Sequence, residues 1–240
     1  MKTIQKGMKM AVLLLAMFSI VNCGKKDDTL TVVPHEWWTE TNPSMYQYSN
    51  EGKTMIFFIV PEENFASLVG YEGMTELVVP SQIKYKSNKW VVKSVGTMRG
   101  INRTDELKKI TTPTTVEFIT HNAFENCKQL KEVNLAEGLH TIGEDAFFNC
   151  QKLDEMVFPS TLKKICPDAF YGCNHLRQLF FQSEVPPTLR KAFMKRRSPY
   201  YEVFVPEKYL NTYEDPSIYQ DKRSMDFYYS VHKFIPFDFE

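Results

Sequence analysis

Three of the five cysteines, Cys127, Cys150 and Cys173, stand 23 residues apart, and such regular thiols could bind a metal ion or form disulfides. A zinc site is usually built from C-x-x-C pairs and suitably spaced histidines. The chain has no C-x-x-C pair, and its histidines do not follow the 23-residue spacing. Because free cysteine is among the most buried residue types, the spacing favours a ladder of reduced thiols in the core. A disulfide between neighbouring thiols is the alternative, since an oxidising compartment permits one.

The chain carries none of the common catalytic motifs. The sequences G-x-S-x-G and H-E-x-x-H and the P-loop, which mark serine hydrolases, zinc proteases and nucleotide-binding proteins, do not occur in it. We therefore predict a protein with no catalytic residues, no metal and no cofactor, and keep a hydrolase as the alternative. A formal net charge of +0 argues against a dedicated nucleic-acid binder.

The 23-residue spacing extends to the residues around the cysteines. An Ala-Phe pair and a leucine recur in step with them, at Ala123, Ala146 and Ala169, each followed by Phe, and at Leu107, Leu130, Leu153 and Leu176. A fixed period of this length with an L-x-x-L-x-L core is typical of a leucine-rich solenoid. Each coil of a solenoid buries one apolar layer against the next. The Ala-Phe pair is therefore expected to fill the turn between two short strands, with the ring supplying most of the buried area.

The stretch from Ile142 to Pro159, I-G-E-D-A-F-F-N-C-Q-K-L-D-E-M-V-F-P, resembles the BspA-type leucine-rich repeat. The resemblance extends over about residues 77–206, with a lead-in hairpin from Leu77 to Gly96 and a closing strand from Val203 to Pro206. It implies a mainly β solenoid of 23-residue repeats, with an N-terminal β-hairpin cap and a C-terminal cap of strand and helix. The family includes surface proteins that bind host proteins or other cells, and it has no shared catalytic residues to carry over.

The N-terminus has the features of an export signal. A basic start with Lys2, Lys6 and Lys9 is followed by the apolar run Met10–Val21 and then by Cys23. The run is too short for an ordinary membrane-spanning helix. A cysteine at this point resembles the lipid-attachment residue of bacterial lipoproteins, although Asn22 departs from the small residue that the family prefers.

The resemblance implies an exported, lipid-anchored protein that contacts the membrane through Cys23. The sequence Lys26-Asp27-Asp28 resembles the acidic tag that sends some lipoproteins to the outer face of the outer membrane. We therefore predict an outer-membrane lipoprotein at the cell surface, with a periplasm-facing lipoprotein as the alternative.

The order of these features predicts five segments. They are a signal peptide at 1–22, a lipidated tether at 23–50, an N-terminal β cap at 51–96, the solenoid at 97–195 and a C-terminal cap at 196–240. Strands of the first cap are expected at Thr54–Val60, Glu76–Pro80, Gln82–Tyr85 and Trp90–Val95. In the second cap we expect a strand over Tyr201–Pro206 and one or two helical turns over Glu207–Tyr213.

The outward positions of the L-x-x-L-x-L strand are the candidates for partner binding. They vary between coils while the inward positions stay apolar, and in a solenoid they form one continuous surface. The residues selected for partner binding are Lys109, Glu132, Asn134, Glu155, Gln178 and Phe180. Their mixed charge fits adhesion to a protein partner, and any solvated strand face would also carry it.

Two further functions stay open at this point. One is a glycan-binding surface lipoprotein that uses Trp37, Trp38 or the aromatic tail Phe227–Glu240. The other is a structural component of the envelope.

Overall fold

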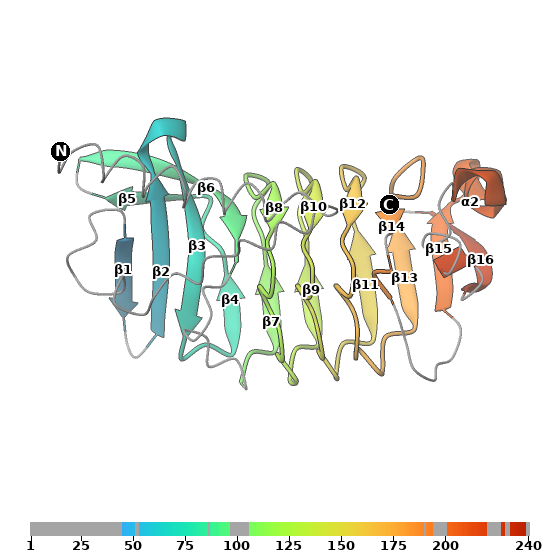
Figure 1. Ribbon diagram of the computed structural model, residues 1–240, viewed down its shortest axis with the longest axis horizontal. Coiled ribbons are helices and arrows are strands. Elements are labelled where there is room, and N and C mark those ends of the chain that lie inside the picture. Colours follow the sequence, from blue (N-terminus) through green and yellow to red (C-terminus); the bar gives the residue numbers. More distant parts are fainter. Residues whose placement is uncertain are drawn as a thin grey trace, which may run out of the picture.

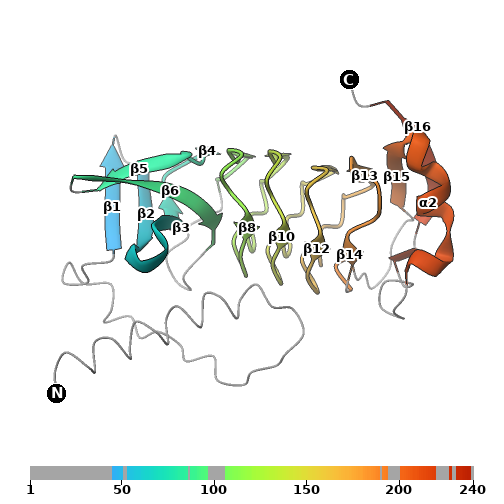
Figure 2. The same cartoon turned by 90° about the horizontal axis from the view of Figure 1, so that it is seen from above.

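The computed structural model describes residues 45–96 except 51, 52 and 86, residues 106–189 and 191–193, residues 201–219, and residues 227, 228 and 231–238. In these parts the chain forms a mainly β solenoid of about 5 turns with repeats of about 24 residues (Figure 1). The coils stack along one axis, and each contributes a short strand to two separate faces (Figure 2). The mainly β solenoid predicted from the sequence is confirmed.

The L-x-x-L-x-L segments build the first face from parallel strands. Two sheets make it up, and they do not pair with each other: one has the order β4-β7-β9 and the other β11-β13-β15-β16. The strands are β4 (Glu76–Val78), β7 (Lys109–Thr111), β9 (Glu132–Asn134), β11 (Glu155–Phe158), β13 (Gln178–Phe181), β15 (Tyr201–Pro206) and β16 (Val231–Phe237). Paired residues on β11 and β13, such as Glu155 and Gln178, are 23 residues apart in the sequence. Paired residues on β13 and β15, such as Gln178 and Glu202, are 24 residues apart.

The second face is a single sheet of nine strands that joins the coils to the N-terminal cap. Its solenoid strands pair in parallel and are only two residues long: β8 (Phe118–Ile119), β10 (Thr141–Ile142), β12 (Lys164–Ile165) and β14 (Thr188–Leu189). The sheet continues into the cap through β6 (Asn88–Val95), β3 (Phe65–Glu72), β2 (Lys53–Val60) and β1 (Met45–Asn50), with β5 (Gln82–Tyr85) paired antiparallel to β6.

The turn between the two faces depends on left-handed backbone at two repeat positions. Both have positive φ in successive coils, at Asn122, Asp145, Asp168 and Lys191, and at Asn126, Asn149 and Gly172. Asn, Asp and Gly adopt this conformation at the lowest steric cost, because a short polar side chain can bond locally and glycine has no Cβ. The N-D-D and N-N-G series of the repeat therefore reflect backbone geometry rather than a ligand.

A column of stacked rings runs through the core. The rings of Phe124, Phe147, Phe170 and Phe193 are stacked at centroid distances of 5.2, 5.2 and 5.0 Å. All four side chains are buried, as are the alanines that precede them. The Ala-Phe pair thus fills the turn between the strands, as predicted from the sequence.

The caps close both ends of this column with further aromatic residues. Tyr71 on β3 lies 5.9 Å from Phe124, ring centre to ring centre. At the other end, Tyr201 and Phe227 lie 5.4 and 5.2 Å from Phe193. One hydrophobic cluster therefore extends from the N-terminal cap to the C-terminal cap.

The expected cap strands are present, and the sequence analysis missed two more. Strand β1 occupies the last residues of the segment predicted as a tether, and β3 contains Ala, Ser and Gly, which are weak strand formers. Opposite β3, Ile56 pairs with Gly70 and Phe57 with Leu68, so Val69 is an extra, bulged residue. The bulge breaks the alternation of apolar and polar residues by which a strand is recognised.

The C-terminal cap has the composition that the sequence predicts. Strand β15 is followed by the 3-10 turn Glu207–Tyr209, the short helix α2 (Leu210–Glu214) and a second 3-10 turn, Pro216–Ile218. Tyr213 of α2 is buried, and its hydroxyl donates to the carbonyl of Ser183 at 3.1 Å. The helix is therefore anchored to the last coil.

The lipid-attachment residue Cys23 and the pair Trp37 and Trp38 lie outside the described residues. Among the helices that are described, none combines the length and the apolar character needed to span a bilayer. The five segment boundaries stay predictions.

We expect Phe147→Ala to lower the free energy of unfolding by about 3–5 kcal/mol, because the buried ring stacks on Phe124 and Phe170. Cys150→Ala changes the same coil but removes a single buried sulfur, and we expect a loss of about 1 kcal/mol. Chemical denaturation followed by circular dichroism measures both. Equal losses in the two variants would contradict a core organised by its rings.

Candidate functional site

The alternation of β9, β11 and β13 determines which side chains face solvent. Residues alternate between the two sides of a strand, and Val133, Met156 and Leu179 point into the core. Their neighbours Glu132, Asn134 and Glu155 are exposed, whereas Gln178 and Phe180 are half-buried. The residues selected from the sequence thus lie on the outward side of the first face.

Strand pairing within each of the two sheets, together with the 23-residue repeat across the break between β9 and β11, arranges these outward side chains in two rows that cross the coils. We call the first the charged row, and it consists of Glu76, Lys109, Glu132, Glu155, Gln178, Glu202 and Lys233. The second, two residues further along each strand, consists of Val78, Thr111, Asn134, Val157, Phe180, Phe204 and Ile235. The six selected residues are distributed over both rows.

Three of the six residues form one polar network. The ammonium of Lys109 lies 2.6 Å from Oε1 of Glu132, and the amide of Asn134 donates to the same oxygen at 2.8 Å. The hydrogen bond to Glu132 raises the pKa of Lys109, and the bonds from Lys109 and then Asn134 lower the pKa of Glu132. Both groups are therefore charged at neutral pH, and they neutralise each other on this part of the face.

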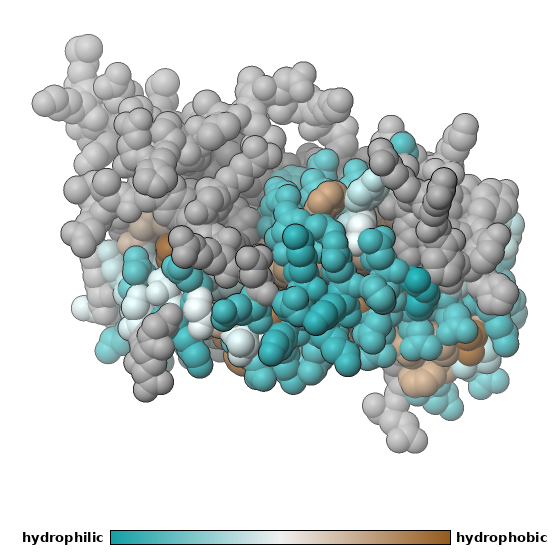
Figure 3. Space-filling model, turned by 90° about the horizontal axis from the view of Figure 1, so that it is seen from below, coloured by the Kyte–Doolittle hydropathy of each residue, from teal (hydrophilic) through white to brown (hydrophobic). Residues whose placement is uncertain are grey.

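The C-terminal coils of the same face have a different character. The amide of Gln178 donates to Oε2 of Glu202 at 3.1 Å, and the ring of Phe180 stacks on that of Phe204 at 4.4 Å. Figure 3, which views the molecule from below, shows polar side chains over the middle coils and an apolar patch towards the C-terminal end. The change coincides with the break between the sheets that end in β9 and begin with β11.

The cysteine ladder lies in the core, and two of its thiols donate hydrogen bonds to backbone carbonyls. The thiol of Cys150 donates to the carbonyl of Phe124 at 3.3 Å, and that of Cys173 to the carbonyl of Phe147 at 3.1 Å. Cys127, Cys150 and Cys173 are free thiols and fully buried, as the sequence predicts. Burial, followed by the neighbouring thiol of Cys173, raises the pKa of Cys150.

No group of three or more His, Cys, Asp or Glu side chains suited to a metal ion occurs within the described parts of the chain. A family model for the BspA type leucine rich repeat region matches residues 101–214 in 6 copies. This part of the chain is a BspA-type leucine-rich repeat region. Surface proteins built from such repeats are generally binding or adhesion modules, and typically not enzymes.

Solved structures of bacterial leucine-rich repeat proteins are similar to the chain. One from Bacteroides capillosus is 23% identical, with a TM-score of 0.47 over 57% of this chain and 98% of that one. A leucine rich cell surface protein from Faecalibacterium prausnitzii is 15% identical, with a TM-score of 0.39 over 69% of this chain and 72% of that one. The leucine rich repeat protein of T. pallidum is 18% identical, with a TM-score of 0.43 over 79% of this chain and 98% of that one. A search of curated proteins finds no significant match.

The sequence analysis missed the part of the face that lies beyond the regular BspA-type repeats. Glu202 and Phe204 continue the two rows, but they stand 24 rather than 23 residues after Gln178 and Phe180. The available signal was the sequence Tyr201–Pro206 itself, in which Tyr201, Val203 and Val205 place a large apolar residue at every second position. Lys233 and Ile235 follow at no repeat spacing, so only the pairing of β16 with β15 places them on the face.

We expect the thiols of Cys127, Cys150 and Cys173 to resist iodoacetamide in the folded repeat region at pH 8 and to react fully after unfolding. Burial excludes the reagent, and the raised pKa of Cys150 keeps that thiol protonated. Peptide mapping by mass spectrometry before and after denaturation measures the labelling of each residue. Native labelling at the rate of an exposed cysteine would contradict the buried ladder.

Proposed function

We propose that this protein is an exported, lipid-anchored binding module that recognises a protein partner through the outward side of the first face. The observation that carries the proposal is the register of that face, in which strand pairing aligns varied outward side chains over an invariably apolar interior. A partner that contacts several coils at once could be distinguished by the series of side chains rather than by any single residue.

The dimensions of the face suit a protein better than a small molecule. Seven strands contribute to it, and at about 4.8 Å between strands they extend over roughly 29 Å. A stable protein interface buries about 800 Å² on each partner. A long, shallow face of this kind offers the area for such contact, whereas small ligands bind in concave pockets.

The core supports this function by holding the face rigid. The strands from β4 to β15 are each fixed from beneath by a buried residue of the continuous cluster, such as Ile110, Val133, Met156 or Leu179, and β16 packs on it through the partly buried Phe234. A rigid surface loses little conformational entropy when a partner binds. The proposed binding therefore requires no rearrangement of the coils.

We expect the triple variant Lys109→Ala, Glu132→Ala, Glu155→Ala to fold normally and to lose affinity for its partner. Exposed strand positions cost within about 0.5 kcal/mol each, and removing Lys109 together with Glu132 leaves neither charge without its counterion. Because these charges lie in the open, the loss should fall mainly on the association rate and on the salt dependence. Surface plasmon resonance against a panel of purified matrix proteins and polysaccharides measures both.

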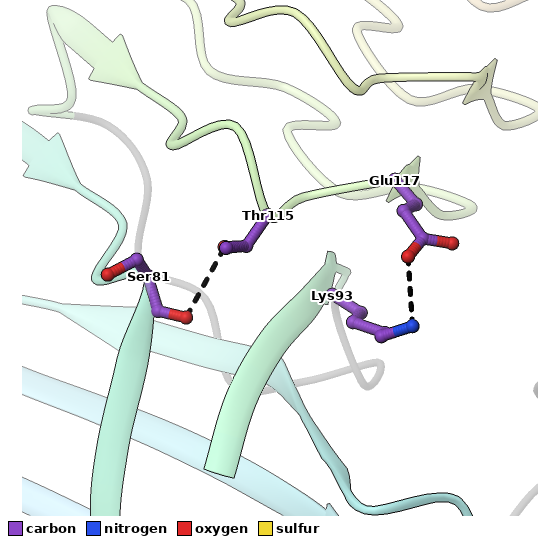
Figure 4. A network of polar contacts seen from close by, with 4 residues as sticks. All are labelled: Ser81, Lys93, Thr115 and Glu117. Atoms are coloured by element: carbon purple, nitrogen blue, oxygen red, sulfur yellow. Dashed lines mark hydrogen bonds and ion pairs between the residues drawn. The ribbon is translucent and has the colours of Figure 1, made fainter.

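A matched control changes the opposite side of the molecule. Lys93 and Glu117 form an ion pair of 2.9 Å at the second face (Figure 4), and Glu144 is exposed nearby in the following coil. The control Lys93→Ala, Glu117→Ala, Glu144→Ala removes the same charges and should bind like wild type. Equal losses in both triples would show a general charge effect and refute the outward face as the site. Loss only with Trp37→Ala and Trp38→Ala would favour the glycan-binding function.

The proposed anchor predicts a simple change of fractionation. Cys23→Ala should move the protein from the membrane fraction to the soluble fraction, because the thiol that would carry the lipid is gone. Membrane and soluble fractions are compared by immunoblotting, with Cys150→Ala as the control that keeps the anchor. A Cys23→Ala protein that stays in the membrane fraction, beside an unprocessed wild type, would refute lipid anchoring.

A further inference from the structure

Beyond Val78 in the N-terminal cap, which is also exposed, the second outward row changes from polar to apolar between two successive coils. It carries Thr111 and Asn134 in the earlier coils, and then Val157 and Phe180. We call the apolar part the apolar strip, and it consists of Val157, Phe180, Phe204 and Ile235 with Phe237 at the end of β16. Val157 is 37% exposed and Phe237 41% exposed, so the strip reaches solvent.

The core of the solenoid is filled by residues other than those of the strip. The inward neighbours Met156, Leu179 and Val203 fill the core and are fully buried. Outward positions in a half-exposed sheet are ordinarily polar. Apolar side chains at four successive outward positions and at Phe237 therefore indicate a surface that binds something apolar.

The arrangement of the rings favours a protein over a glycan. Phe180 and Phe204 are stacked with an angle of 12° between their planes, so each ring covers one face of the other. Phe237 stands nearly perpendicular to both, at 73° and 82°. A sugar needs an open ring face to stack on, whereas aliphatic side chains of a protein pack against ring edges and methyl groups alike.

Two carboxylates run beside the strip. Glu155 and Glu202 occupy the charged row on either side of Gln178, two residues back along their strands from Val157 and Phe204. Neither carboxylate takes part in the ion pairs of Lys93 and Lys109 that the described residues form. Lys233 is the cation at the end of the row, which leaves the row one negative charge in excess beside the strip.

The guanidinium of Arg177, which precedes Gln178, is directed away from the row. Nη1 of Arg177 donates to the carbonyls of Asn174 and Leu176, at 2.8 and 2.9 Å. The exposed Asp154, immediately before Glu155 and β11, adds a further negative charge. A complementary ligand thus carries positive charge on one side of an apolar stripe.

The spacing of the strands identifies the form of that ligand. Neighbouring strands stand about 4.8 Å apart. Residues three and four apart in an α-helix are displaced by about 4.5 and 6 Å along its axis, whereas alternate residues of a β-strand are about 6.6 Å apart. A helix lying across the strands can therefore place successive apolar side chains on successive strands, which an extended segment cannot do.

We propose that the apolar strip, with Glu155 and Glu202 beside it, binds a basic amphipathic helix of a partner protein. The inference rests on the proposed function and names the kind of segment that the C-terminal half of the face recognises. The polar network of Lys109, Glu132 and Asn134 lies in the other half, where its charges are already paired.

The test uses the purified full chain and three fluorescent peptides of equal length. The first is a helical peptide with leucines at i, i+4, i+7 and i+11 and lysines along one flank. The second has the same composition in a scrambled order without an apolar stripe, and the third has glutamates in place of the lysines. Fluorescence polarisation at low and at physiological salt gives the dissociation constants.

We expect the first peptide to bind at least ten-fold more tightly than either control. Phe237→Ser together with Val157→Thr should weaken it at least ten-fold, because these are the most exposed members of the strip. Glu155→Gln together with Glu202→Gln should weaken it at low salt and reduce its salt dependence. Lys93→Gln together with Glu117→Gln, at the second face, should leave it unchanged.

Circular dichroism establishes that each variant is folded, and the exposed pair is used because Phe180→Ser and Phe204→Ser would also disturb the ring stack. Equal binding of the amphipathic and scrambled peptides would overturn the inference. Equal affinity of the amphipathic peptide for wild type and for the Phe237→Ser, Val157→Thr variant would also overturn it. Binding of a polysaccharide that the strip variants abolish would overturn it in favour of a glycan. If the peptides fail while partner binding still depends on Lys109 and Glu132, only this inference falls and the proposed function stands.

Discussion

The column of stacked phenylalanines is the interaction on which the rest of the molecule depends. A solenoid coil contacts only its neighbours, so its position must be fixed by what passes directly from one coil to the next. The rings of Phe124, Phe147, Phe170 and Phe193 repeat at 5.0–5.2 Å, close to the distance of about 4.8 Å between strands. Each ring therefore sets the height and rotation of the following coil, and with it the alignment of the outward side chains.

The thiol ladder complements this column by satisfying the backbone beside it. The carbonyls of Phe124 and Phe147 each accept a thiol from a later coil, at Cys150 and Cys173. At the N-terminal end the hydroxyl of Tyr71 donates to the carbonyl of Ala123 and lies 3.6 Å from the sulfur of Cys127. The cap thus ends both the ring column and the thiol ladder with a single phenol, whose pKa burial raises.

Much of this architecture could be predicted from the sequence, because a repeated residue has a repeated environment. The repeated spacing of Ala146-Phe147 and Cys150 was enough to predict which residues form the core. The alternation of apolar and polar residues after Leu153 was enough to predict which side chains face outward. The missed features are those that depend on one particular pairing. The bulge in β3 interrupts the alternation by which a strand is recognised in a sequence. The ion pair between Lys109 and Glu132 can be predicted only when the strand register is known as well as the spacing. Glu202 and Phe204 were not predicted to lie on the face because they follow Gln178 and Phe180 by 24 residues rather than 23.

The outward side chains of the first face change in character along the solenoid, whereas the inward side chains do not. From Thr111 to Phe204 the second row passes from polar to aromatic while the inward residues of the same strands stay equally buried. The change falls where one three-stranded sheet ends at β9 and the four-stranded sheet begins at β11. Because the inward residues are buried on both sides of this break, packing of the core does not explain the difference. The proposed contact with a partner accounts for it, since an exposed row of apolar side chains otherwise favours only aggregation.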